Sequence, residues 1–159
     1  MWHLPKAVSL VAGHAEGDTE LNAFDRALQD ARVADINFLR VTSVMPPGAR
    51  IIDLPRYPAG LLLPAVYARV ASSRAGERIA AAIGIGICRD RHGVIMEHTV
   101  HGPGPEADAA VRRMVEEGLR IRGLALDEIV TAVSEHTVQR AGCAVAVALF
   151  WPAPNGLAS

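Results

Sequence analysis

The apolar run between Arg78 and Arg89 constrains the fold of this chain more than any other segment. Nearly every residue in it is small or β-branched, which is typical of a strand buried on both faces. The chain has ample apolar material for such a core, because 50% of its 159 residues are hydrophobic and only 21% are charged. At this length we expect one domain, and so large an apolar supply also predicts interfaces between copies of the chain.

Hydrophobic periodicity and turn residues predict two helices among several strands. The first helix is expected from Thr19, a suitable N-cap, to Arg32, and the second from Glu106 to Arg122. Their apolar stripes are Leu21, Phe24, Leu28 and Ala31 in the first and Ala107, Ala110, Val111, Met114 and Val115 in the second. Strands are expected at residues 6–12, 35–43, 61–72, 78–89, 93–99, 128–138 and 143–151, with irregular chain at 13–18 and 46–64. This order favours an α+β fold with helices outside the sheets.

Charge and cysteine content exclude several classes of partner. A net charge of -1 gives no reason to expect nucleic acid or an anionic membrane surface. No apolar run approaches the length that spans a bilayer, and the amino terminus lacks the pattern of a signal peptide. Cys88 and Cys143 lie inside apolar runs and are expected to be buried free thiols. We therefore expect a cytoplasmic protein.

An apolar strand ends at a hydroxyl pair, Thr42-Ser43, shortly before the double proline Pro46-Pro47. The prolines fix their own φ and keep the chain after Ser43 out of a helix. A serine hydroxyl in a strained backbone can attack the preceding carbonyl and turn the amide into an ester. Elimination then gives a dehydroalanine, which hydrolyses to a pyruvoyl group and ammonia. The alternative is an ordinary turn in which both hydroxyls bond to the nearby backbone.

Several segments, taken together and in order, resemble the pyruvoyl-dependent arginine decarboxylases. They are residues 8–13, 16–17, 21–25, 37–47, 95–97, 122–123, 135–138 and 142–144. The resemblance covers the whole domain. It implies a four-layer α/β/β/α sandwich of the pyruvoyl-dependent histidine/arginine decarboxylase type, cleaved into residues 1–42 and 43–159. It also implies a homotrimer of cleaved protomers, with a dimer of trimers as a further option.

The resemblance assigns Ser43 as the modified residue, with cleavage between Thr42 and Ser43. The pyruvoyl group formed there would bind the amine of arginine as a Schiff base and accept electrons as carbon dioxide leaves, giving agmatine. Neither a metal nor pyridoxal phosphate is then required. Glu97 takes the position of the family's catalytic acid, and the apolar residues before it suit a carboxylic acid that stays partly protonated. Taken alone, Glu97 is equally well a charge at a strand end.

Asn37 matches an asparagine that the family needs for processing and catalysis, where its amide can donate to the oxyanion on the Thr42 carbonyl. In a straight strand, six steps of about 3.3 Å separate residues 37 and 43 by roughly 20 Å. Either the strand bends sharply or Asn37 acts from a neighbouring subunit. A third interpretation is a strand residue that bonds to a nearby loop.

Asp25 corresponds to the family's aspartate for the guanidinium of arginine, a group that carboxylates bind in a bidentate manner. Leu21 and Leu28 are expected to line the methylene stem of the substrate. Arg26 adds a cation beside this site, so it either points away or indicates another substrate. Lysine and ornithine remain alternatives to arginine.

Two other functions fit parts of the sequence. One is an uncleaved oligomer that serves as a small-ligand sensor or scaffold of the same fold. The other is a metal hydrolase that uses His98 and His101, although these residues lie in an expected strand and lack the helical His-Glu-x-x-His pattern. Glu135-His136 fits no catalytic pair and is expected to have a structural role at a strand end.

Overall fold

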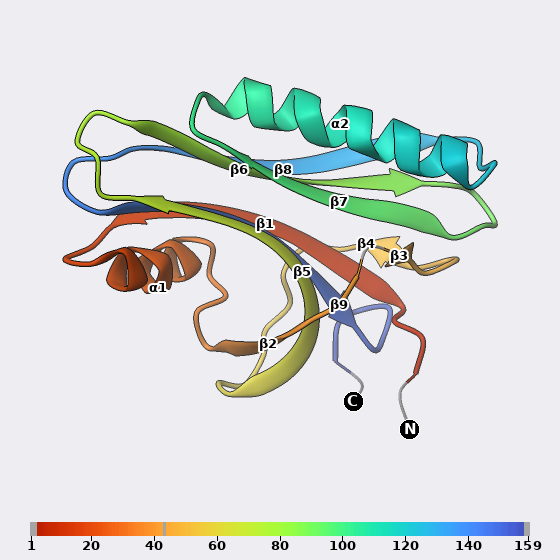
Figure 1. Cartoon of the computed structure of the whole chain (residues 1–159). Helices are drawn as coiled ribbons and strands as arrows, with labels where there is room; N and C mark the ends of the chain where they lie inside the picture. Colours follow the sequence, from red (N-terminus) through yellow and green to blue (C-terminus); the bar gives the residue numbers. More distant parts are fainter. Residues whose placement is uncertain (1–2, 43, 158–159) are drawn as a thin grey trace.

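The computed structural model describes residues 3–42 and 44–157. Within these residues, helices α1 (Glu20–Asp30) and α2 (Gly104–Ile121) accompany two β-sheets. Figure 1 shows the sheets packed face to face, with α1 outside one sheet and α2 outside the other. The predicted α+β class is therefore confirmed. No helix in the described part of the chain is long and apolar enough to cross a membrane.

The first sheet has the strand order β2-β5-β9-β1-β4. Strand β9 lies antiparallel to both β1 and β5, whereas β2 runs parallel to β5 and β4 runs parallel to β1. These strands are β1 (Ala7–Glu16), β2 (Ile36–Arg40), β4 (Arg50–Ile51), β5 (Leu61–Ser72) and β9 (Gly142–Trp151). Strand β2 lies at the edge of this sheet, and Val41 and Thr42 follow directly after its last residue, Arg40.

The second sheet is antiparallel throughout and has the strand order β3-β7-β6-β8. Its strands are β3 (Val44–Met45), β6 (Arg78–Ile87), β7 (Gly93–Val100) and β8 (Glu128–Thr137). Each of these strands except β3 begins within one residue of its expected start. Strand β3 is too short for hydrophobic periodicity to reveal, because two residues contain no full alternation.

Strand β6 is buried on both faces, as its composition predicts. Ile83 and Ile85 belong to the core between the sheets, whereas Ala82 packs on the α2 side. Gly86 lies under α2, and a Cβ there would approach the Val115 side chain to 2.5 Å. Small residues on one face thus let the helix lie close to the sheet, while branched residues on the other face fill the core.

Helix α1 starts where predicted, because the Thr19 hydroxyl accepts a hydrogen bond from the Asn22 N–H. Its buried residues are Ala23, Ala27 and Leu28. Leu21, which the periodicity placed on the buried stripe, is instead 69% exposed. The stripe was wrong because alanines form the contact with the sheet, which turns Leu21 toward solvent.

Strand β1 continues through the segment that the sequence predicted as a loop. A Cβ on Gly13 would lie 2.3 Å from the carbonyl oxygen of Ala27. Gly13 therefore serves the close approach of α1 to the strand rather than a turn. The strand ends only at Glu16.

The Glu16 carboxylate holds the turn between β8 and β9. Its Oε1 accepts from the N–H of Gln139 at 2.8 Å, and its Oε2 accepts from the N–H groups of Arg140 and Ala141 at 3.0 and 3.2 Å. The His136 Nε2 lies 2.6 Å from Oε1. These contacts give His136 the structural role that the sequence predicted. Burial raises the pKa of Glu16, but the hydrogen bonds outweigh it and lower the pKa to about 2.

We expect Glu16 to make stability depend on pH in acid. Because its folded-state pKa of about 2 lies below the ordinary value of 4.5, its contribution is present above pH 4.5. The contribution is lost as the pH falls toward 2, where the carboxylate protonates in the folded state as well. Melting temperatures of wild type and Glu16→Gln should therefore differ most near neutral pH and converge toward pH 2. Asp18→Asn, at a mostly exposed carboxylate nearby, is the matched control. A difference in melting temperature between wild type and Glu16→Gln that does not change with pH contradicts the expectation.

Candidate active site at the crossing between the sheets

The chain crosses from the first sheet to the second between Arg40 and Val44. Arg40 ends β2 opposite Ala65, and the next N–H, that of Val41, donates to the Ala65 carbonyl at 3.1 Å. Val44 begins β3 opposite Val94. Ser43, the predicted pyruvoyl precursor, lies outside the described residues. Val41 before it and Val44 after it are thus held to different sheets.

The carbonyl that precedes position 43 already has a hydrogen-bond donor. The Val44 N–H donates to the Thr42 carbonyl oxygen at 3.3 Å. This oxygen would carry the negative charge if the preceding carbonyl were attacked. A backbone N–H directed at it is therefore suited to stabilise an oxyanion.

Glu97 lies beside the crossing. Among the described residues, β3 pairs with Gly93 and Val94 of β7, and Glu97 lies three residues further along β7. On that stretch the Glu97 side chain is 30% exposed, and its Oε1 lies 3.5 Å from the Arg40 Nη2. The sequence predicted apolar neighbours for this carboxyl, and the structure adds a guanidinium to them. The reason is tertiary, because the side chain of Arg40 at the end of β2 lies next to Glu97 of β7.

Among the described residues at the crossing, Arg40 is a neighbour of Glu97 to which the sequence analysis gave no role. Its guanidinium carbon lies 4.7 Å from the centre of the Tyr67 ring, and its Nη2 donates to the Tyr67 carbonyl at 3.4 Å. The available signal was an arginine in an otherwise apolar strand, immediately before Val41-Thr42. That signal is weak without the structure, since strand arginines usually point to solvent.

Asn37 is not directed at the Thr42 carbonyl within its own chain. Its Nδ2 donates to the Gly60 carbonyl at 3.1 Å, as in the interpretation of a strand residue bonded to a loop. The pairing of β2 with β5 is regular from Ile36 to Arg40, so the strand does not bend sharply there.

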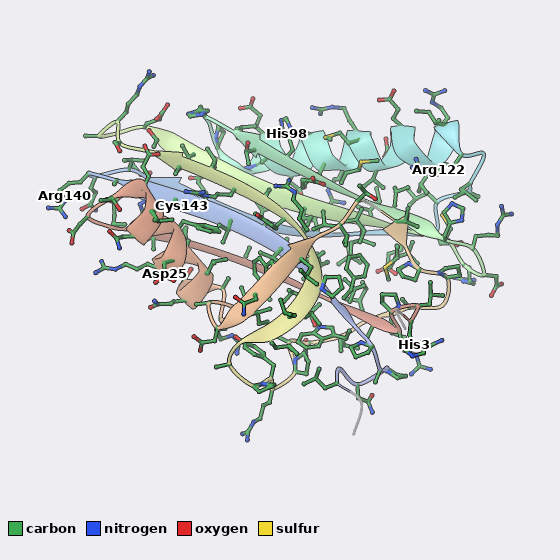
Figure 2. The ribbon with its side chains drawn as sticks, turned by 60° about the horizontal axis from the view of Figure 1, so that its bottom comes forward. His3, Asp25, His98, Arg122, Arg140 and Cys143 are labelled. Carbon is green, nitrogen blue, oxygen red and sulfur yellow. The ribbon has the colours of Figure 1, made fainter. Side chains whose placement is uncertain are left out.

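The residues predicted to bind substrate lie on the other side of the first sheet from Glu97. Asp25 is exposed on α1 and accepts a hydrogen bond from the Gln29 side chain at 2.9 Å. Leu28 is buried against the sheet, whereas Leu21 is exposed. Figure 2 shows Asp25 on the α1 side and His98 on the second sheet. One chain therefore does not bring Asp25 to Glu97.

Arg26 does not oppose the predicted guanidinium site. Its Nη1 donates to the Glu16 carbonyl at 3.4 Å, which draws the side chain toward β1. The Arg26 guanidinium is therefore engaged at the end of β1, whereas the Asp25 carboxylate bonds to Gln29 on α1.

A shallow apolar hollow of about 320 Å³ adjoins the crossing. Val41, Thr42 and Val44 line it together with Pro64 and Phe150. Val41 and Val44 are partly exposed there. The described residues that line the hollow are mostly apolar, and the hollow is open to solvent.

The histidines of the metal-hydrolase alternative have other surroundings. His101 Nδ1 lies 2.8 Å from the Glu77 carboxylate, in an exposed pair. In residues 3–42 and 44–157, no group of three or more metal-ligating side chains is found together. Cys88 and Cys143 are buried free thiols, as predicted, and burial raises the pKa of Cys143 to about 11.

Comparison with known proteins identifies the family. The family model described as pyruvoyl-dependent arginine decarboxylase (PvlArgDC) matches residues 7–154. A pyruvoyl-dependent arginine decarboxylase of Methanocaldococcus jannaschii is 45% identical over 150 residues, covering 93% of this chain and 91% of the relative. Relatives of the same name from Methanococcus maripaludis strain C7 and Thermococcus sibiricus are 42% and 41% identical, over 92% and 95% of this chain and 91% and 98% of their own length. The match includes the crossing, Glu97 and α1, and this chain belongs to the pyruvoyl-dependent arginine decarboxylase family.

Proposed function

We propose that this chain cleaves itself and then converts arginine to agmatine and carbon dioxide. The observation that carries the proposal is the position of Glu97, a carboxyl group beside the segment in which Thr42 precedes the serine. Family membership gives the reaction, because relatives with more than 40% identity are named pyruvoyl-dependent arginine decarboxylases. The position of Glu97 beside Thr42 agrees with the reaction that family membership indicates.

The residues around position 43 fit a pyruvoyl group. A hydroxyl-bearing residue stands there in the sequence, and the apolar hollow lined by Thr42 and Val44 adjoins it. When present, a pyruvoyl group supplies a ketone that binds an amine and accepts the electrons released with carbon dioxide. The donor set in this part of the chain calls for no metal and no pyridoxal phosphate.

Self-cleavage begins when the Ser43 hydroxyl attacks the Thr42 carbonyl. The Val44 N–H, which donates to the Thr42 oxygen at 3.3 Å, stabilises the negative charge that develops there. The products are a chain of residues 1–42 and a chain of residues 43–159 whose first residue is modified. These two chains together make one domain, because β1 and β2 of the first pair with β9 and β5 of the second.

Glu97 acts as the proton donor to the α-carbon of the substrate after carbon dioxide has left. Asp25 binds the guanidinium end, and Leu21 and Leu28 contact the methylene stem. Asp25 lies on the far side of the first sheet from Glu97, so both reach one substrate only if they come from different chains.

A homotrimer satisfies this requirement. A heterologous interface within a closed ring brings two different surfaces of the protomer together. Asn37 then acts on the neighbouring protomer, in keeping with the regular β2 ladder in its own chain. Exposed apolar residues near the crossing are suited to the interface: Leu4, Val41, Val44 and Leu62.

The order of layers supports the finer fold assignment. Separate clusters of buried residues lie between α1 and the first sheet, between the sheets, and between α2 and the second sheet. We propose that this is the four-layer α/β/β/α sandwich of the pyruvoyl-dependent histidine/arginine decarboxylase type. The cytoplasmic location and the dimer of trimers stay predictions from the sequence.

The proposal is tested by intact mass and by product analysis of the purified wild-type chain. We expect two species that correspond to residues 1–42 and 43–159, the larger with a keto acid in place of its amino-terminal serine. Incubation with arginine should release agmatine and carbon dioxide, with lysine and ornithine as competing substrates. A single intact chain that binds arginine without turning it over would instead support a sensor or scaffold.

A further inference from the structure

We propose that Arg40 is a positioning residue that holds the cleavage segment and Glu97 in register with each other. This inference rests on the proposed function and assigns a role within the same site. Its basis is the contact between Arg40 Nη2 and Glu97 Oε1 at 3.5 Å, which links the end of β2 in the first sheet to β7 in the second.

Arg40 is fixed from two other directions. The Tyr67 ring lies under its guanidinium at 4.7 Å, and the Tyr67 carbonyl accepts from Nη2 at 3.4 Å. A planar guanidinium can stack on a ring and bind an oxygen at its edge at the same time, which an ammonium group cannot do. The three contacts together define where the side chain, and with it the last residue of β2, lies relative to Glu97.

The contribution of this ion pair to stability is expected to be small. The side chains of Arg40 and Glu97 are 59% and 30% exposed, and exposed pairs of this kind stabilise proteins little. Its position is more informative than its strength. Arg40 lies two residues before Thr42, whose carbonyl is attacked, and Glu97 is the proposed proton donor. The pair therefore links the two reacting parts of the site.

After cleavage the pair joins two separate chains. Arg40 belongs to the chain of residues 1–42 and Glu97 to the chain of residues 43–159. The pair then keeps the new carboxyl end of the smaller chain near Glu97 of the second sheet, and the contacts to Tyr67 keep it on β5 of the first sheet.

The first test measures self-cleavage, which requires no substrate. Freshly purified, uncleaved Arg40→Gln, Arg40→Lys and wild type are compared by the rate at which the intact chain disappears on denaturing gels. We expect Arg40→Gln to cleave about tenfold more slowly, because the segment is less well oriented. Arg40→Lys should recover part of the rate, since it restores the charge without the stacked plane.

Arg78→Gln is the matched control. Arg78 forms an ion pair with Glu135 at 3.6 Å, and both residues lie on the second sheet. Their side chains are 55% and 39% exposed, which is similar to the exposure of Arg40 and Glu97. We expect wild-type cleavage in this variant. Tyr67→Phe and Tyr67→Leu provide a second comparison, in which only the loss of the ring should slow cleavage. Melting temperatures of all variants show whether the fold is retained.

Chemical rescue separates positioning from general damage. In Arg40→Ala, added guanidinium ion at low concentration should restore part of the cleavage rate by occupying the place over the Tyr67 ring. Equal sodium chloride should not, and Arg78→Ala should respond to neither. Once fully cleaved, Arg40→Gln should show kcat lowered about tenfold and KM nearly unchanged, because the proton donor rather than substrate binding is disturbed.

The outcomes distinguish this inference from the proposed function. If wild type itself never cleaves, the proposed function is wrong. If wild type cleaves and Arg40→Gln folds, cleaves and turns over at the same rates, the role of Arg40 is wrong and the proposed function stands. If Arg40→Gln does not fold, the two Tyr67 variants provide the test. Equal cleavage rates for Tyr67→Leu and Tyr67→Phe then overturn the inference.

Discussion

Replacing Ser43 with alanine is expected to leave one intact chain of 159 residues without decarboxylase activity. The hydroxyl is the attacking group, and alanine offers no nucleophile at the same position. Thr42 cannot replace it as nucleophile, because the Thr42 hydroxyl is on the residue that carries the attacked carbonyl and not on the residue that follows it. Intact mass after prolonged incubation measures the first effect. Release of carbon dioxide from arginine measures the second, with a loss to the background of the uncatalysed reaction.

Thr42→Ser is the matched control for this prediction. It removes one methyl group beside the cleaved bond and keeps the carbonyl that is attacked, so cleavage and turnover should remain. Ser43→Ala should also melt at a temperature close to that of uncleaved wild type, since Val41 and Val44 pair with their sheets through backbone groups. Cleavage at the same bond in Ser43→Ala contradicts the assignment of the nucleophile.

Much of the fold could be predicted because its strands are long and apolar. Strand β5 has the bounds that the sequence predicted, and β6 is buried on both faces as its composition indicated. Capping chemistry located the start of α1 at Thr19. These features are local, so a single sequence contains the information for them.

Contacts between distant segments could not be predicted. The role of Gly13 depends on the Ala27 carbonyl, and that of Glu16 depends on a turn more than a hundred residues later. A glycine and an acidic residue three positions apart look like a loop until their partners are known. The error at β1 therefore came from tertiary packing that overrides local preference.

The candidate site likewise contains residues that the sequence could predict and contacts that it could not. Chemistry and family resemblance pointed to Ser43 and Glu97, whereas the guanidinium of Arg40 beside Glu97 appears only when two sheets are brought together. Asn37 bonds to the Gly60 carbonyl from a regular β2 ladder, and its action on a neighbouring subunit stays a prediction. The spacing of residues 37 and 43 suggested a contribution from a second chain, but it could not say which surfaces would meet.

Replacing Glu97 with glutamine is expected to separate cleavage from turnover. Cleavage should go to completion, because the amide oxygen of glutamine can still contact the Arg40 guanidinium and the Val44 N–H still donates to the Thr42 carbonyl. Turnover should fall by about 10²–10⁴, the usual contribution of a positioned general acid. Glutamine matches glutamate in shape but has no acidic proton, so substrate binding and KM should change little. Steady-state kinetics on the fully cleaved variant measures both quantities.

The proton itself provides a sharper readout than the rate. In heavy water the wild type should place one deuterium on the former α-carbon with a single configuration, since one carboxyl group delivers it from one side. Product formed by Glu97→Gln should carry deuterium in both configurations, because water then supplies the proton. Glu117→Gln, at an exposed carboxylate of α2, is the control and should match wild type. Stereospecific labelling that persists in Glu97→Gln would mean that another group donates the proton, and Glu97 would then be left with its contact to Arg40 as its role in the site.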